Sequence, residues 1–265
     1  ISHSEATLRI LGGRDALKDE FPFAIRLETH TTDASETVHQ FCTGAAITTT
    51  WVLSAGHCYE PVRDALQESN KKLYARYNSY FPEYPGQLAP ILEHYIHPGY
   101  NSIIQSDVKS FLDDIIKNDV ALFRCGRISV SVYAKISAID YRTIVGHEAT
   151  VLGFGYTNAS EADKPLQVLK GMLINCLEGD APTELMMCLV PPCGLVTTIC
   201  GGDSGGPILH PTGVVGVNSG SVDDCNEYTK HLRRTPGTSA SIIAMVSPHM
   251  NWMSNIITNK TSSSP

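Results

Sequence analysis

A serine surrounded by glycines is the part of this sequence with the clearest chemical use. Ser204 lies in the run Cys200-Gly201-Gly202-Asp203-Ser204-Gly205-Gly206-Pro207. Acyl transfer requires a hydroxyl that can approach a carbonyl carbon, and two fixed N–H groups that receive the charge developing on the carbonyl oxygen. Glycine permits this close approach of the backbone. We therefore interpret Ser204 as a nucleophile, with the amides of Gly202 and Ser204 as its oxyanion hole. The alternative is a glycine-rich turn with an incidental serine.

Two further segments supply the partners that such a serine needs. A serine hydroxyl is a poor nucleophile near neutral pH unless a base takes its proton and a carboxylate orients that base. His57 comes at the end of a strand-like region with the apolar runs 45–47 and 51–53, and Asp119 precedes the apolar run 120–123. Either residue alone is more often a structural histidine or a turn aspartate. The order His, Asp, Ser along the chain nevertheless favours a catalytic triad of His57, Asp119 and Ser204.

The motifs around these residues resemble those of the chymotrypsin and trypsin family of serine proteases over nearly the whole chain. The matching segments are Ile10-Leu11-Gly12-Gly13, Phe41-Cys42-Thr43-Gly44, His97-Pro98-Gly99-Tyr100-Asn101, Val151-Leu152-Gly153-Phe154-Gly155, Pro236-Gly237 and the helix candidate 248–253. A shorter segment, 75–79, resembles arthropod and mite digestive members. The resemblance implies an all-β fold of two packed six-stranded Greek-key β-barrels with a C-terminal helix. It places the boundary between the two barrel subdomains near residues 130–145.

Length, composition and charge are compatible with that fold. The 265 residues, 42% of them hydrophobic, are enough to bury a large core. Glycines and prolines separate short apolar runs, as in all-β proteins. The sequence contains no apolar run of about 18 residues that could span a membrane. The net charge of -7 argues against a nucleic-acid partner. We therefore expect neither membrane nor nucleic acid among the partners.

The residues before Ile10 are few, polar and end in Arg9. The resemblance implies that residues 1–9 are an activation peptide and residues 10–265 the protease domain. Cleavage after Arg9 would free the ammonium group of Ile10, which would pair with Asp203 and organise the oxyanion loop. A buried carboxylate requires such a partner. The chain is thus identified as a zymogen that needs an upstream activating protease. The alternative is an N-terminal extension on an enzyme that is already active.

The resemblance also suggests which substrate side chain the enzyme prefers. Thr198, six residues before the nucleophile, matches the base of the family's primary pocket and is neutral. Gly220 and Gly237 match two wall positions where small residues leave the pocket open, so an apolar or aromatic guest is expected instead of a basic one. Basic residues in the long segment 225–236 could turn toward the pocket and favour an acidic guest instead.

One departure from the family pattern concerns the strand beside this pocket. Asn218-Ser219-Gly220 stands where the family usually has Ser-Trp-Gly. We expect Asn218 to replace a hydroxyl that normally supports the catalytic aspartate. We also expect Ser219 to replace an aromatic surface that normally packs on the substrate.

Eight cysteines indicate an oxidising compartment. The resemblance implies three disulfides, which are Cys42–Cys58, Cys176–Cys188 and Cys200–Cys225. Cys125 and Cys193 match no family disulfide; they could pair with each other, stay free or reach another chain. Glycosylation acceptor patterns at Asn158 and Asn259 suit a secreted, extracellular protein. No signal peptide is visible, and we expect it to have been removed.

The hypothesis that unites these features is a secreted serine endopeptidase, made as a zymogen and acting through an acyl-enzyme. Its expected partners are protein or peptide substrates, an activating protease and protein inhibitors. No cofactor or metal is expected, and Glu83 stands alone where the family's calcium loop would need paired carboxylates. The competing hypothesis is a catalytically weak or inactive homologue that acts by binding other proteins. The altered 218–219 segment motivates it, and so do two long loops, one between Tyr100 and Asn118 and one from Cys225 to Pro236.

Overall fold

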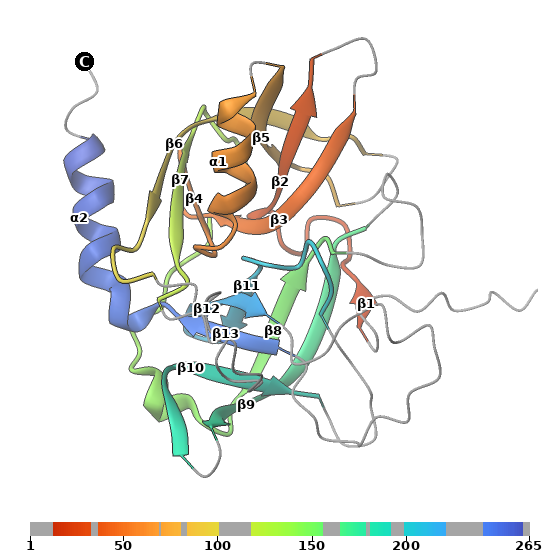
Figure 1. Cartoon of the computed structure of the whole chain (residues 1–265). Coiled ribbons are helices and arrows are strands. Elements are labelled where there is room, and N and C mark those ends of the chain that lie inside the picture. The colour runs from red at the N-terminus through yellow and green to blue at the C-terminus, as the bar shows by residue number, and fades with distance from the viewer. Residues whose placement is uncertain are drawn as a thin grey trace, which may run out of the picture.

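The computed structural model describes residues 13–32, 37–68, 70–80, 84–100, 118–155, 165–178, 181–191, 199–220 and 241–261 (Figure 1). Several predictions fall outside these residues, namely those on Arg9, Ile10, Asn158, Cys193, Thr198, Cys225, Gly237 and the loop 101–117.

Six strands of the N-terminal half close into a barrel. They are β2 (Ala24–Thr31), β3 (Val38–Ala46), β4 (Trp51–Ser54), β5 (Lys71–Tyr77), β6 (Gln87–Ile96) and β7 (Ala121–Cys125). Neighbouring strands are antiparallel, in the order β2-β3-β4-β7-β6-β5 around the barrel. Strand β5 illustrates the sequence pattern behind this arrangement. Leu73, Ala75 and Tyr77 are buried and alternate with more exposed residues, which is the period of a strand with one face in a core.

A second barrel forms from the C-terminal half. Its strands are β8 (Glu148–Gly153), β9 (Gln167–Glu178), β10 (Ala181–Val190), β11 (Pro207–His210), β12 (Gly213–Gly220) and β13 (Ser241–Met245). Strand β8 pairs with both β9 and β11, which closes the order β8-β9-β10-β13-β12-β11. The short β1 (Arg14–Asp15) pairs with the start of β9. The prediction of two six-stranded antiparallel barrels is therefore confirmed.

Few helices accompany the barrels in the described part of the chain. Helix α1 (Tyr59–Gln67) follows β4, and the 3-10 turn η1 (Tyr141–Ile144) precedes β8. The chain ends with the 3-10 turn η3 (Ser247–His249) and helix α2 (Met250–Thr261), which confirms the expected C-terminal helix. None of the described helices is long and apolar enough to cross a membrane.

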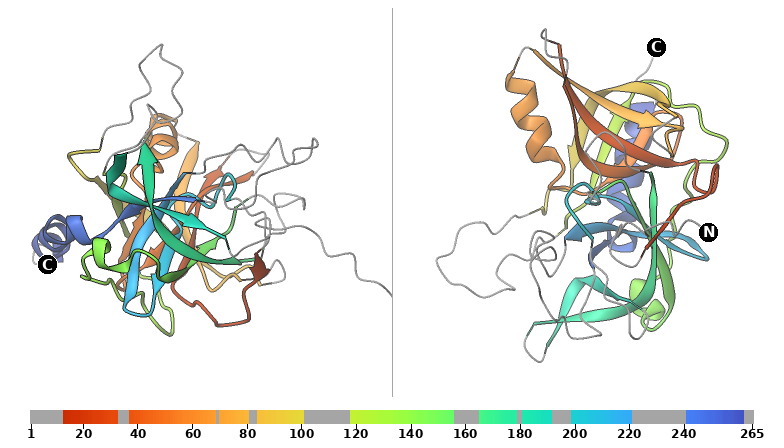
Figure 2. Two further views of the ribbon diagram at one scale, coloured as in Figure 1. Left: turned by 90° about the horizontal axis from the view of Figure 1, so that it is seen from below. Right: turned by 90° about the vertical axis from the view of Figure 1, so that its right-hand side faces the viewer.

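Helix α2 comes from the C-terminal half but packs against the first barrel. Met253, 3% exposed, belongs to the same buried cluster as Trp51 and Leu122 of the first barrel. Figures 1 and 2 show α2 beside the first barrel, along β6, with the C-terminal end directed away from the second barrel. The last residues of the chain thus complete the core formed by much earlier ones.

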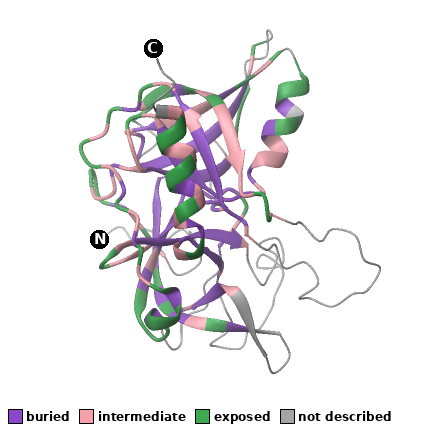
Figure 3. Ribbon diagram, turned by 90° about the vertical axis from the view of Figure 1, so that its left-hand side faces the viewer, coloured by how far each residue is buried: buried purple, intermediate pink, exposed green. Residues whose placement is uncertain are grey.

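The two barrels pack against each other along a buried seam. A small apolar cluster unites Ala24 at the start of β2 with Leu152, Phe154 and Leu166 around β8 and β9. Figure 3 shows buried segments running through both barrels, while exposed residues collect on the helices and connecting loops. The segments that carry the predicted catalytic residues all reach this seam, as the site geometry shows.

Candidate active site

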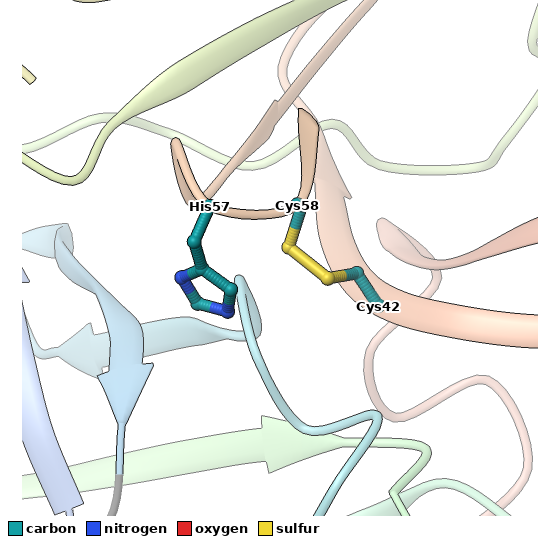
Figure 4. A group of neighbouring side chains, drawn as sticks. All are labelled: Cys42, His57 and Cys58. Carbon is teal, nitrogen blue, oxygen red and sulfur yellow. A yellow bond between two sulfur atoms is a disulfide. The ribbon is translucent and has the colours of Figure 1, made fainter. Parts of the chain in front are cut away.

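His57 is held at the seam by the turn that follows β4. The side chain of Ser54, at the end of β4, donates a 2.7 Å hydrogen bond to the carbonyl of Thr43 on β3. A disulfide joins Cys58 to Cys42 on the same strand. Figure 4 shows His57 and Cys58 on one turn, with Cys42 on the neighbouring strand and the imidazole beside the disulfide. Both sides of the histidine turn are therefore attached to the barrel.

Asp119 lies two residues before β7 and orients His57 through two contacts. The carboxylate is fully buried, at 0% exposure. Oδ1 accepts the backbone N–H of His57 at 2.7 Å, and Oδ2 lies 2.8 Å from Nδ1 of the imidazole. A buried carboxylate in this position fixes the ring orientation and favours the tautomer that carries its proton on Nδ1. Nε2 is then left as the basic nitrogen.

Ser219 completes the hydrogen bonding of the Asp119 carboxylate. The Ser219 hydroxyl donates to Oδ2 at 2.6 Å. The expectation that Asn218 had replaced this supporting hydroxyl is therefore wrong, because the hydroxyl is present one residue later. The cause is a register shift between β12 and β13, where Asn218 pairs with Ile243 but Gly220 pairs with Ile242. The extra residue in this bulge turns the side chain of Ser219 toward Asp119.

The environment of His57 adjusts its basicity. Burial lowers the pKa of the imidazole, but the charge of Asp119, the hydrogen bond to it and the charge of Glu60 outweigh this effect. The pKa of His57 therefore lies above its ordinary value of 6.5. A stronger base can accept a hydroxyl proton more readily, provided that it is unprotonated at the working pH.

Ser204 is carried by a tight loop that the glycines allow to enter the seam. Its carbonyl accepts the N–H of Thr43 at 2.8 Å, and the N–H of Gly205 donates to Asn218 at 2.7 Å. Gly205 has a φ of +76°, and a Cβ there would lie 1.9 Å from the Ser54 hydroxyl. Only glycine fits this position. The serine loop and the start of the histidine turn, at Ser54 and Ala55, are consequently in direct contact.

The amides expected to form the oxyanion hole are held by their neighbours. Gly202 adopts a φ of +91°, in the region that favours glycine. Its carbonyl accepts hydrogen bonds from the Thr43 hydroxyl at 2.7 Å and from the Gln40 amide at 3.3 Å. Thr43 in turn accepts the N–H of Phe154 at 3.0 Å. Within the described part of the chain, the N–H groups of Gly202 and Ser204 donate no hydrogen bond.

Asp203 lies in a cradle formed by backbone. The side chain is fully buried, and its oxygens accept the N–H of Gly155 at 2.7 Å and of Cys200 at 2.9 Å. A Cβ added to Gly153 would lie 2.0 Å from Oδ1, and one added to Gly155 would lie 2.3 Å from the carboxyl carbon. These two glycines make room for the carboxylate. The conformation of the oxyanion loop is therefore coupled to the charge of Asp203.

Comparison with known proteins agrees with this geometry. The family model described as trypsin matches residues 10–242. The chain belongs to the trypsin family. Granzyme M of Rattus norvegicus is 26% identical over 263 residues, covering 94% of this chain and 89% of that protein. Kallikrein-2 of Homo sapiens is 25% identical and covers 82% of this chain and 81% of its own length, and trypsin of Phaedon cochleariae is 29% identical with 80% and 78% covered. With this family membership, the chain is a serine endopeptidase, and its substrates are proteins or peptides.

The disulfides in the described residues are those that the family resemblance implies. Cys42 is joined to Cys58, and Cys176 to Cys188. Cys200 is also disulfide-bonded, and its expected partner Cys225 lies outside the described residues. The cluster of Cys42, Cys58 and His57 has the proximity of a metal site, but the two sulfurs are bonded to each other and supply no thiolate ligands.

Cys125, whose state the sequence left open, is a free thiol in the core. It is 1% exposed at the end of β7, and burial raises the pKa of its thiol to about 12. A buried, protonated thiol is neither a nucleophile nor accessible to a second chain. Of the three alternatives considered, the structure selects the free cysteine.

The roles of several residues around the site were not predicted from the sequence. Thr43, Gly153 and Gly155 were noted only as parts of family motifs, although they hold the oxyanion loop and Asp203. The sequence shows a serine directly after Asn218. It contains no pattern that predicts the bulge, and the bulge directs the Ser219 side chain toward Asp119. Ser241, which contacts Asn218, carried no recognisable signal.

Proposed function

We propose that the chain is a secreted zymogen of a trypsin-family endopeptidase, whose catalytic residues are His57, Asp119 and Ser204. The observation that carries this assignment is the fully buried Asp119 carboxylate, which binds His57 through both its backbone and its ring and is itself held by Ser219. Such an arrangement has a direct use in acyl transfer, because a buried carboxylate stabilises the imidazolium that forms during the reaction.

The proposed reaction proceeds in two stages. His57 Nε2 takes the proton of the Ser204 hydroxyl as its oxygen attacks the scissile carbonyl carbon, and the N–H groups of Gly202 and Ser204 receive the oxyanion. The imidazolium then gives the proton to the leaving amine, which breaks the peptide bond and leaves an acyl ester on Ser204. Water attacks this ester with His57 again as the base, and the carboxylate product and free hydroxyl are released.

Activation is proposed to follow cleavage between Arg9 and Ile10. The support for this step is the environment of Asp203, a fully buried carboxylate in the loop that carries Gly202 and Ser204. A new ammonium group beside this carboxylate would stabilise its charge and the loop around it. If residues 1–9 were only an extension on an active enzyme, cleavage would change little.

The proposed substrates have an apolar or aromatic side chain before the cut bond, because Thr198 offers no negative charge to a basic guest. Secretion is proposed from the disulfides, since such bonds persist in oxidising compartments. An activating protease and protein inhibitors are the further partners that this assignment implies.

Labelling with a fluorophosphonate probe tests the proposal. The probe reacts only with an activated serine, so the protein cut after Arg9 should be labelled rapidly, the uncut protein slowly and the Ser204→Ala variant not at all. Labelling of cut and uncut protein at equal rates would refute the zymogen step alone. Cut, folded protein that remains unlabelled would instead support the non-catalytic binding homologue. The presence of the Ser219 hydroxyl removes one reason for that alternative.

A further inference from the structure

Two histidines outside the candidate active site meet where β11 ends and β8 begins. His210 is the last residue of β11, and His147 directly precedes β8. These strands are antiparallel neighbours, with Leu209 opposite Thr150, so the end of one lies beside the start of the other. Nδ1 of His147 is 3.1 Å from Nε2 of His210. The sheet therefore brings together two imidazoles that are far apart in the sequence.

The backbone fixes the positions of both histidines while their rings stay accessible. The N–H of His147 donates to the carbonyl of Ile144 at 3.1 Å, and its carbonyl accepts the N–H of Leu173 at 2.9 Å. His210 pairs with Gly213 in the hairpin between β11 and β12. His147 is exposed and His210 is half-buried. An ion from solution can therefore reach two rings whose main-chain positions are already set.

The second nitrogen of the His210 ring has a partner of its own. Nδ1 is 2.9 Å from the Thr212 hydroxyl, which is 2.7 Å from the Ser137 hydroxyl. When Nδ1 carries the proton and shares it with this hydroxyl, Nε2 presents its lone pair to His147. The N–H of Thr212 also lies 3.3 Å from Nδ1 and favours the opposite tautomer, in which Nε2 donates a proton to His147. An ion that binds between the rings must displace that proton.

The distance between the facing nitrogens suits a transition-metal ion. Imidazole nitrogen binds Zn²⁺ at about 2.0–2.1 Å, so two such ligands on one tetrahedral or square-planar ion lie about 2.8–3.4 Å apart. The observed separation of 3.1 Å falls within this range. The ring planes differ by 29°, and rotation of the accessible rings about their side-chain bonds directs both lone pairs at one ion. The two rings can therefore share an ion without a change in the backbone.

The remaining ligands of such an ion would come from water. In the part of the chain that the structure describes, no third histidine, cysteine or carboxylate joins the pair. The carboxylate of Glu148, the next residue, is bound by Lys170 at 3.0 Å. Nitrogen ligands favour Cu²⁺ over Zn²⁺, whereas Ca²⁺ and Mg²⁺ prefer oxygen ligands. The donor set therefore selects transition metals.

We propose that His147 and His210 form a surface site for a divalent transition-metal ion, Zn²⁺ or Cu²⁺, bound through His147 Nδ1 and His210 Nε2. Thr212 is a positioning residue, since its hydroxyl accepts the Nδ1 proton of His210 and so orients the ring. The ion joins the start of β8 to the end of β11 and releases the displaced proton to solvent. This site is separate from the proposed protease chemistry, and it replaces the expectation from the sequence that the chain binds no metal.

Metal titrations of the full, uncut chain near neutral pH test the site. We expect Cu²⁺ to bind more tightly than Zn²⁺, and Ca²⁺ not to bind at the pair. His147→Gln and His210→Gln should each weaken Zn²⁺ binding more than tenfold. Thr212→Val should weaken it about tenfold, as expected for a residue that orients a ligand. The variant with both histidines replaced measures binding elsewhere on the chain, which is subtracted.

His94→Gln is the matched control. His94 is half-buried like His210, but its ring packs on that of Tyr59, with the ring centroids 4.4 Å apart. Its replacement should leave Zn²⁺ binding as in wild type. Electron paramagnetic resonance of the Cu²⁺-loaded protein identifies the ligands directly. The wild-type spectrum should show coupling to two imidazole nitrogens, and the spectrum of each single variant of the pair should show coupling to one.

Thermal melting supplies a second measurement. Because both rings are accessible, the variants should melt at the wild-type temperature without metal, and Zn²⁺ should raise the melting temperature of wild type more than that of the double variant. Equal Zn²⁺ and Cu²⁺ affinities in wild type and the double variant would overturn the site. A loss in His94→Gln as large as in His147→Gln, or Ca²⁺ binding at the pair as tight as Zn²⁺ binding, would overturn it as well. An unchanged affinity in Thr212→Val would overturn the role of Thr212 alone.

Discussion

Removing the Ser219 hydroxyl should impair catalysis without changing how substrate binds. Asp119 Oδ2 receives two hydrogen bonds, one from Ser219 at 2.6 Å and one from the His57 ring at 2.8 Å. Ser219→Ala deletes the first of these inside a site where the carboxylate has no exposure to solvent. The carboxylate then depends on His57 alone within the described part of the chain, and the ring loses part of its positional restraint.

The size of the effect follows from the charge of the acceptor. A hydrogen bond to a charged group contributes about 1.5–3 kcal/mol, which corresponds to about a 10- to 150-fold lower kcat if it is fully expressed in the transition state. Part of this free energy also stabilises the folded state, so its loss will appear as a lower melting temperature and not as a lower kcat. A carboxylate with fewer donors also interacts more strongly with the imidazolium. The pKa of His57 should therefore rise further, and the acid limb of kcat/KM should move to higher pH.

The assay compares Ser219→Ala with wild type after activation and titration of active sites. We expect a lower kcat, a nearly unchanged KM and a displaced acid limb. Ser137→Ala is the control for loss of a buried hydroxyl and should displace neither kcat nor the acid limb. A folded, activated Ser219→Ala enzyme with wild-type kcat and pH profile would refute the positioning role.

Three further outcomes are expected. Gly220→Trp should raise kcat/KM about tenfold, because a Cβ there would meet no heavy atom of the described residues within 4 Å, and an indole can cover substrate with about 1–2 kcal/mol of apolar burial. Ser219→Trp should abolish activity, because it removes the hydroxyl that donates to Asp119. Equal effects of the two changes would contradict this placement of Ser219. Gly155→Ala should prevent activation after cleavage, since its Cβ would lie 2.3 Å from the Asp203 carboxyl carbon, and probe labelling at the wild-type rate would exclude this. Burial, with a smaller effect of the His97 charge, lowers the pKa of His249 from 6.5 to about 4, so the folded state holds this ring neutral. Stability should be retained above pH 6.5 and lost as the pH falls toward 4, and thermal melts of His249→Phe should show a smaller loss than wild type.

The sequence identified the chemistry of the site better than its local geometry. The triad was predictable because nucleophile, base and orienting carboxylate each occur in a short motif of recognisable composition. The role of Ser219 was not predictable, since a β-bulge changes which side chain faces Asp119 without changing the residues themselves. An alignment by motif assigned the supporting position to Asn218, one residue too early.

The same holds for buried residues and for helices, of which the sequence predicts some features and not others. The apolar composition of β7, in which four of five residues are buried, could have indicated that Cys125 is a core residue, although its lack of a disulfide depends on distances across the fold. Helix α1 begins two residues after His57, with Pro61 in its first turn, and its presence was not anticipated. Its sequence is short and was interpreted only through the neighbouring histidine motif.

The packing of α2 on the first barrel has a consequence for biosynthesis. Translation delivers the six strands of that barrel long before Met253, which contributes to the same buried cluster. Until α2 leaves the ribosome, the apolar side chains that Met253 and Val246 cover are open to water and to chaperones. The first barrel therefore lacks part of its buried apolar contacts until α2 is in place. A polypeptide released before α2 would carry its Ser204 loop but an unfinished N-terminal core, so truncated products should be degraded before they could act as unregulated proteases.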